Sequence, residues 1–145
     1  MGLSVSDAVT GSARGDGRRY AFGPVVSRRL GRSLGVDLVP YKTCSYDCIY
    51  CQLGRTTRLT AVRSQFAPLA RVVEDALRAL EISGPADYIT LSGSGEPTLC
   101  TRLDELIAAL KARTGVPIAV LTNGSLLFRP EMRRELAGAD LVVPS

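Results

Sequence analysis

Three cysteines lie within eight residues of this sequence, at Cys44, Cys48 and Cys51. The chain contains one other cysteine, Cys100. A cysteine thiolate is a soft anionic ligand, and clustered thiolates suit iron–sulfur clusters or zinc. A four-iron cluster normally takes one thiolate per iron, so three neighbouring cysteines leave one iron without a protein ligand. That open iron position can bind a substrate or a cofactor.

Zinc binding and disulfide bonding are the other uses of such cysteines. A structural zinc site takes four ligands, usually Cys or His. The chain has no histidine, and Cys100 is distant in sequence, so zinc is disfavoured but stays open. Short secreted chains stapled by disulfides usually carry more cysteine. We expect Cys100 to be a small buried residue, because an isolated cysteine is more often packed than bound to metal.

A second candidate site is the glycine-rich stretch Ser92-Gly93-Ser94-Gly95-Glu96-Pro97, which follows an apolar segment. Glycines after a strand allow the backbone to approach a ligand closely. Backbone carbonyls and a carboxylate at the end of a strand suit a ligand with an ammonium group. The alternative is an ordinary turn, because glycine is the usual residue in turns.

The cysteine spacing C-x3-C-x2-C, with Tyr50 just before the third cysteine, resembles the signature of the radical S-adenosylmethionine (SAM) superfamily. The wider runs 27–37 and 51–56 are similar to one branch of it. That branch contains Fe–S oxidoreductases similar to the enzymes that build the tricyclic wyosine base in tRNA. The resemblance covers about residues 20–145. It implies a partial (β/α)6 TIM-like barrel, of which this chain supplies about the first four strands.

The resemblance assigns roles to the two motifs. It implies that a 4Fe-4S cluster is held by Cys44, Cys48 and Cys51. It also implies that the second motif, usually Gly-Gly-Glu-Pro, contacts the amino group of SAM. Here Ser94 stands in the position of the first glycine, and the remaining positions match, namely Gly95, Glu96 and Pro97.

Three further positions are cofactor contacts by the same resemblance. The backbone of Tyr50 lies along the adenine, or its ring packs in the core. Asn123 faces SAM or the substrate, or it forms a plain turn with Gly124, since Asn-Gly is a common turn pair. Ser145 follows the last predicted strand, where relatives contact the SAM ribose.

The implied activity is reductive cleavage of SAM to a 5′-deoxyadenosyl radical, which abstracts hydrogen from a substrate that the sequence does not identify. A tRNA base is the analogy within the branch, and a flavodoxin or ferredoxin is the expected electron donor. One alternative is an Fe–S electron carrier with four protein ligands, Cys100 being the fourth. Another is a zinc-binding or RNA-binding module without catalysis. No catalytic side chain is singled out, and histidine-based acid–base chemistry is excluded within this chain.

The elements that must position these residues alternate along the chain. Alternating and apolar runs predict strands, and three- and four-residue spacing of apolar residues predicts helices. The predicted strands are 33–39, 87–92, 118–122 and 140–143, and the predicted helices are 69–80, 103–110 and 130–138. Thr101 and Asp104 are predicted to cap the second helix. This order indicates an α/β fold with a parallel sheet, in which ligands bind at the carboxyl ends of the strands.

Length and composition indicate one domain of 145 residues. Residues 1–19 are predicted to be a flexible tail, and residues 20–145 a radical SAM core truncated after its fourth strand. We expect such a partial barrel to bind a cluster poorly or to turn over slowly. No apolar run is long enough to span a membrane, and no signal-peptide core is present, so we expect a cytoplasmic protein. The net charge is +4, and the early arginines suit RNA phosphates or a solvated surface.

Overall fold

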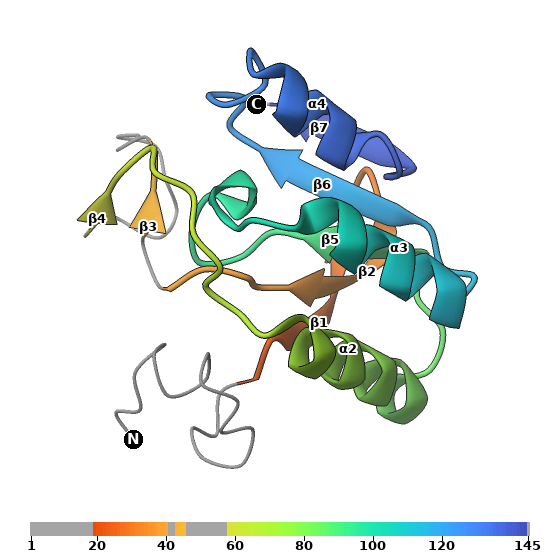
Figure 1. Ribbon diagram of the computed structural model, residues 1–145. Coiled ribbons are helices and arrows are strands. Elements are labelled where there is room, and N and C mark those ends of the chain that lie inside the picture. Colours follow the sequence, from red (N-terminus) through yellow and green to blue (C-terminus); the bar gives the residue numbers. More distant parts are fainter. Residues whose placement is uncertain (1–18, 41–42, 46–57, 145) are drawn as a thin grey trace.

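The fold is built around a five-stranded sheet, seen in the computed structural model, which describes residues 19–40, 43–45 and 58–144. The strands are β1 (Ala21–Ser27), β2 (Gly31–Val36), β5 (Tyr88–Leu91), β6 (Ile118–Thr122) and β7 (Leu141–Pro144). They lie side by side in this order (Figure 1). β1 is antiparallel to β2, and the other neighbours are parallel. This is the predicted α/β fold, arranged as in the first part of a TIM-like barrel.

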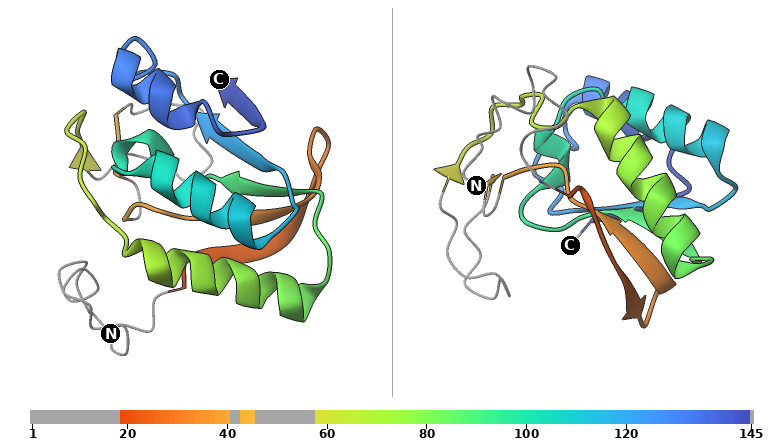
Figure 2. Two further views of the ribbon diagram at one scale, coloured as in Figure 1. Left: turned by 45° about the vertical axis from the view of Figure 1, so that its right-hand side comes forward. Right: turned by 90° about the horizontal axis from the view of Figure 1, so that it is seen from below.

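Three helices pack on one face of the sheet. They are α2 (Leu69–Ser83), α3 (Leu103–Arg113) and α4 (Pro130–Leu136), and a short 3-10 helix, η1 (Pro97–Leu99), precedes α3. α2 packs against α3, and α3 packs against α4. The views in Figure 2 show the helices on the same side of the sheet. Right-handed βα units connected in sequence produce this arrangement, because each helix returns the chain to the start of the next parallel strand.

The core lies between the sheet and these helices. Alternate residues of a strand point to opposite faces, so one set from each strand faces the helices. The fully buried large side chains include Leu34, Ile89, Leu91, Leu103, Leu106, Ile107, Leu110, Ile118 and Met132. Cys100 is also fully buried, which confirms its prediction as a small buried residue. In the described part of the chain, no helix is long and apolar enough to cross a membrane.

The four predicted strands and three predicted helices are all present, and β6 has the predicted bounds. Two of the interpretations need correction. The first predicted strand, β2, ends at Val36 and not at Val39. It is also the second strand of the sheet, because β1 precedes it. Gly23-Pro24 interrupts the pattern of β1, and the pairing with β2 shifts between Phe22 and Val25. A proline is tolerated there because β1 is an edge strand.

The predicted capping pair at the start of α3 is wrong. The N-cap residue is Arg102, at a φ of 63°, and no side chain of the preceding segment caps the helix. The Leu103 N–H instead donates to Oε1 of Glu135 in α4, at 3.1 Å. A carboxylate from a later helix therefore replaces the local cap, and it also suits the positive end of the helix dipole.

Candidate metal and cofactor site

The candidate site lies at the carboxyl ends of β2, β5 and β6. Two short strands, β3 (Thr43–Cys44) and β4 (Arg58–Leu59), form a separate parallel pair beside this edge (Figure 1). β3 and β4 flank the rest of the cysteine motif. Cys48, Cys51 and Tyr50 lie outside the described residues, and so does Ser145. The predictions for these four residues therefore stay predictions.

Of the three predicted cluster ligands, Cys44 lies among the described residues. It is half-buried. Its Sγ accepts a hydrogen bond from Nδ2 of Asn123 at 3.6 Å, a normal length for a sulfur acceptor. The two residues are 79 positions apart in sequence. The fold therefore brings together two residues that the sequence singled out separately.

The Asn123 side chain is held by a turn at the end of β6. Its Oδ1 accepts the N–H of Ser125 at 2.9 Å, which is the side-chain bond of an Asx turn. Gly124 has a φ of +80°, which favours glycine. Nδ2 of Asn123 also donates to Oγ of Ser45 at 2.9 Å, and the Ser45 and Ser125 hydroxyls lie 2.6 Å apart. Asn123 therefore forms the predicted turn, and its side chain also contacts Cys44 and Ser45. Its predicted contact with SAM or the substrate stays a prediction.

The Glu96 carboxylate is buried, with 3% of the residue exposed. It accepts from the N–H of Asn123 at 2.7 Å, from Oγ1 of Thr122 at 2.5 Å and from the N–H of Thr98 at 3.2 Å. The Thr98 hydroxyl donates to it as well. Three of these bonds go to Oε2 and one, from Asn123, goes to Oε1. The side chain therefore joins the end of β5 to the end of β6.

Ser94, which stands where the motif usually has glycine, bonds to Asp37. The Ser94 N–H donates to Oδ1 of Asp37 at 3.1 Å, and the Ser94 hydroxyl donates to the same carboxylate. Gly93 has a φ of +127°, and a Cβ there would lie 2.7 Å from Cγ of Asp37. Gly95 lies in the same bend and is half-buried. Sequence reasoning missed Asp37, although a polar residue directly after a strand is a usable signal for this edge.

An ion pair fastens the segment that returns from the cysteine loop. The Arg63 guanidinium donates to both carboxylate oxygens of Glu135, at 2.7 and 2.8 Å. It also donates to the carbonyls of Thr98 and Cys100, at 2.8 and 2.7 Å. The bond to Arg63 lowers the pKa of Glu135, and the same bond raises the pKa of Arg63. Sequence reasoning missed this pair, since its members are 72 residues apart.

Cys100 differs from Cys44 in its surroundings. Burial raises the pKa of the Cys100 thiol, although backbone N–H groups of Phe66 and Ala67 partly offset this. A metal-bound cysteine is a thiolate, so such burial disfavours a ligand role. Within residues 19–40, 43–45 and 58–144, no three Cys, Asp or Glu side chains are grouped to hold a metal ion.

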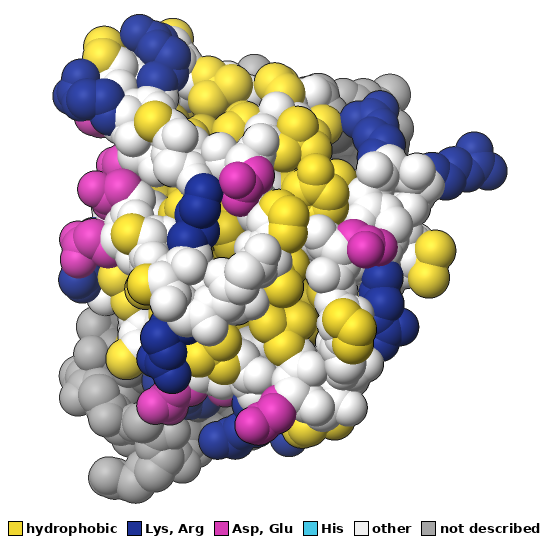
Figure 3. Space-filling view, turned by 90° about the vertical axis from the view of Figure 1, so that its right-hand side faces the viewer, with side chains coloured by type: hydrophobic (Ala, Val, Ile, Leu, Met, Phe, Trp, Pro, Cys, Tyr) yellow, Lys and Arg dark blue, Asp and Glu magenta, His cyan; other side chains and the backbone are white. Residues whose placement is uncertain are grey.

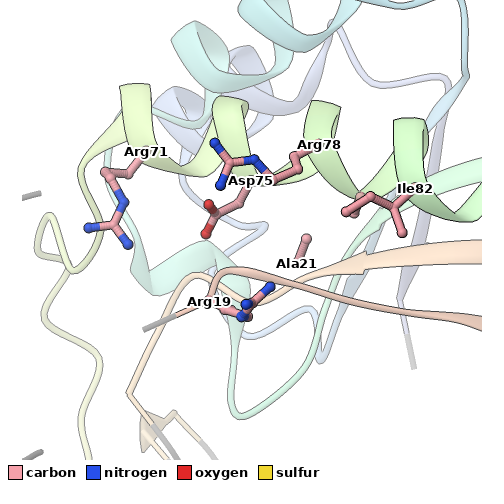
Figure 4. Close-up of a pocket in the computed structure, with 7 residues that line it drawn as sticks. Arg19, Ala21, Arg71, Asp75, Arg78 and Ile82 are labelled. Carbon is pink, nitrogen blue, oxygen red and sulfur yellow. The ribbon is translucent and has the colours of Figure 1, made fainter. Parts of the chain in front are cut away.

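Two of the cavities in the described part of the chain lie beside β1. One of about 330 Å³ lies on the sheet face opposite the helices, where the hydroxyls of Ser33 and Thr90 bond to each other. Phe22 covers Gly35 there, because a Cβ on Gly35 would lie 2.1 Å from the ring. The other, of about 220 Å³, lies between β1 and α2. Figure 4 shows arginines around it, and the lining residues are Arg19, Ala21, Arg71, Asp75, Arg78, Ala79 and Ile82.

The fold and the edge define an α/β protein with a cysteine loop at the carboxyl ends of parallel strands, where such sheets bind ligands. A model of the radical SAM superfamily matches residues 38–145, and the chain belongs to that superfamily. The sheet is accordingly part of a radical SAM TIM-like barrel.

Curated relatives agree with this assignment. The chain is 47% identical over 124 residues to a UPF0026 protein of Synechocystis, covering 83% of this chain and 45% of that protein. It is 43% identical over 125 residues to a UPF0026 protein of Methanocaldococcus jannaschii, covering 84% and 38%. A protein of Brachyspira hyodysenteriae named GTPase Obg is 49% identical over 127 residues, covering 88% and 19%. The chain spans less than half the length of each of these relatives.

The GTPase name is not carried over to this chain. The P-loop of GTPases requires a Gly-Lys pair, whose lysine reaches the phosphates. Neither lysine of this sequence, Lys42 or Lys111, follows a glycine.

Proposed function

We propose that the protein is a radical SAM enzyme whose 4Fe-4S cluster is held by Cys44, Cys48 and Cys51. The observation that carries this proposal is the contact between the Cys44 thiol and Asn123, which follows β6. Asn123 contacts Cys44, and Glu96 holds Asn123 through its backbone. Cluster ligands and SAM contacts belong at one edge of the sheet if they are to serve one reaction.

The donor set of this edge fits the two cofactors. Cysteine thiolates are the usual ligands of iron–sulfur clusters, and three of them leave one iron open for SAM. The bend at Gly93–Gly95, directly before Glu96, is the part of this edge proposed for the SAM amino group. When bound and reduced, the cluster supplies the electron that cleaves SAM into methionine and a radical able to abstract hydrogen from a substrate. The protein orients the groups and excludes water.

The direct test is anaerobic iron and sulfide analysis with electron paramagnetic resonance, run with and without SAM. We expect about four irons per chain and a reduced-cluster signal that changes when SAM is added. Cys48→Ala is expected to lose the cluster. Cys100→Ala is the matched control and is expected to keep it, since that thiol is fully buried.

The alternative functions give different results in the same experiment. A signal that ignores SAM, together with loss of the cluster in Cys100→Ala, would identify a four-ligand electron carrier. Zinc without iron would identify a metal-stapled binding module and would overturn the enzyme proposal. A flavodoxin or ferredoxin is the proposed electron donor, to be tested by reduction of the cluster with each purified protein.

For the substrate, we propose an RNA, in keeping with the tRNA-modifying branch that the sequence resembles. The arginine-lined cavity between β1 and α2 supports this proposal (Figure 4). Arg19, Arg71 and Arg78 line it together with one carboxylate, that of Asp75, which accepts the N–H of Tyr20 at 3.0 Å. The excess positive charge suits phosphate groups, which dominate the affinity of proteins for nucleic acids.

A further inference from the structure

We propose that Asn123 is a positioning residue that holds Cys44 and raises the reduction potential of the cluster bound there. This inference rests on the proposed function, because it concerns the ligand of that same cluster. It differs from the direct SAM contact predicted for Asn123 from the sequence. In this proposal the side chain acts on the protein ligand of the iron.

The orientation of the Asn123 amide is fixed by its partners. Oδ1 accepts the N–H of Ser125 at 2.9 Å, and an N–H can bond only to an acceptor. The NH2 end must therefore face the opposite way, toward the cysteine loop. Its two hydrogens serve Sγ of Cys44 at 3.6 Å and Oγ of Ser45 at 2.9 Å. Both hydrogens of the amide are therefore used on Cys44 and Ser45, and its oxygen holds the turn.

The backbone of Asn123 is anchored just as firmly. Its N–H donates to Oε1 of Glu96 at 2.7 Å, and the Thr122 hydroxyl donates to Oε2 of the same carboxylate at 2.5 Å. Glu96 is 3% exposed and is further held by Thr98. The motif after β5 thus reaches the cysteine loop through Asn123, with no direct contact between Glu96 and Cys44 required.

A hydrogen bond to a cluster thiolate has a predictable electronic effect. Reduction adds negative charge to the cluster, and part of that charge resides on the cysteine sulfurs. An N–H donor stabilises the more negative reduced state, so it raises the potential, as hydrogen bonds to cluster sulfurs generally do. Loss of the donor makes the cluster harder to reduce.

The test is a redox titration of the cluster in the chain without SAM. Electron paramagnetic resonance measures the amount of reduced cluster at each potential. Asn123→Ala removes the donor, and Asn123→Asp keeps the acceptor for Ser125 but replaces the donor with an anionic oxygen. We expect the potential to fall in the order wild type, Asn123→Ala, Asn123→Asp. A tenfold change in the reduction equilibrium, about 59 mV for one electron, is the expected upper scale for Asn123→Ala.

Ser125→Ala is the matched control, because it removes the hydroxyl contact with Ser45 and leaves the bond to sulfur in place. Its potential is expected to equal that of the wild type. The affinity for SAM is measured separately for each variant by isothermal titration.

The outcomes separate this inference from the proposed function. An unchanged potential in both Asn123 variants, at full iron content, would overturn the inference and leave the cluster proposal standing. Weaker SAM binding at an unchanged potential would likewise overturn it, in favour of a direct SAM contact. Zinc in place of iron in the wild-type chain would overturn the proposed function, and this inference with it.

Discussion

A buried carboxylate organises the candidate site at the scale of single residues. Glu96 accepts hydrogen bonds from both the backbone and the hydroxyl of Thr98, from the hydroxyl of Thr122 and from the backbone of Asn123. A buried charge is tolerated only when its hydrogen-bonding capacity is met, and here it is met by donors of two strand ends. The acidic residue of the motif therefore supports the architecture of the edge.

Glu96→Gln tests this role. The glutamine amide has the shape of the carboxylate. Its NH2 group cannot accept hydrogen bonds, so it would face the N–H and O–H groups that now donate to Glu96. We expect the free energy of unfolding to fall by about 2–3 kcal/mol, because hydrogen bonds to a charged group are lost and buried donors are left unsatisfied. Urea denaturation monitored by circular dichroism measures the change, with the slope m unchanged if the folded and unfolded states are otherwise alike.

The matched control is Glu105→Gln, which makes the same chemical change in an exposed ion pair with Arg102 on α3. Exposed pairs contribute little to stability, so its denaturation midpoint is expected to stay near that of the wild type. Equal effects of the two substitutions would show that Glu96 has no special structural role.

The residues of the site were predictable where their signal is local. Cys44 belongs to a short motif, Glu96 belongs to the glycine-rich stretch after one predicted strand, and Asn123 directly follows another, so the sequence singled out all three. Their contacts were not predictable, because the Asn123–Cys44 bond depends on the path of the cysteine loop. Asp37 was missed as a partner of Ser94 for the same reason, since their contact exists only when β2 and β5 are paired.

At the scale of elements, one ion pair connects four parts of the fold. Arg63 lies between β4 and α2 and bonds to the carbonyls that end η1. Its partner Glu135 lies on α4 and caps the first turn of α3. The side chains of the pair are 12% and 18% exposed, so solvent screens them little. The return from the cysteine loop is thereby fixed to the helical layer.

The pH dependence of stability follows from this pair. The pKa of Glu135 is lowered in the folded state, first by the hydrogen bond from Arg63. A lowered carboxyl pKa stabilises the folded state above the ordinary value of 4.5. The contribution is lost as the pH falls through the folded-state pKa, because the unfolded state then binds the proton more tightly.

Glu135→Gln is expected to lower the free energy of unfolding by about 2–3 kcal/mol at neutral pH, since it leaves Arg63 partly buried without its carboxylate. The difference between wild type and variant is expected to stay constant above about pH 5 and to shrink below it. Denaturation curves measured between pH 3 and pH 7 would check this. A difference that grows toward acidic pH would contradict the assigned role.

The elements themselves were predicted best where side-chain spacing is regular. The apolar face of α2 and the run of β6 are continuous patterns, and both elements appear where they were expected. β1 was missed because Gly23-Pro24 breaks its pattern. The α3 cap was wrong because a tertiary contact from Glu135 replaced the local one. Regular packing is encoded locally, whereas edges and helix ends depend on distant partners.

Charge is the property of the whole molecule that bears on its substrate. The net charge is +4. On the face that lies to the right in Figure 1, hydrophobic side chains form a central band, with Lys and Arg and also Asp and Glu side chains beside it (Figure 3). The arginine-lined cavity lies between β1 and α2 (Figure 4). A net positive charge increases the association rate with polyanions and makes their binding sensitive to salt.

Arg78→Gln tests whether this cavity binds RNA. We expect weaker binding to an unmodified tRNA transcript and a salt slope smaller by about one, as for the loss of one phosphate contact. Fluorescence anisotropy at several salt concentrations measures both quantities. Arg113→Gln makes the same change on α3, near Glu74 and Glu105, and is expected to alter binding less. Equal losses in the two variants would indicate a diffuse attraction, and binding by neither protein would contradict an RNA substrate.

The strand order also has a consequence for how the protein is made. The strands of the sheet lie side by side in the same order as they occur along the chain, β1-β2-β5-β6-β7. A growing polypeptide can therefore add one βα unit at a time to a surface that has already left the ribosome. The bond between Asn123 and Cys44 becomes possible when β6 emerges, and the Arg63–Glu135 pair closes only after α4. In chain order, the contact at Cys44 can therefore form before the Arg63–Glu135 pair.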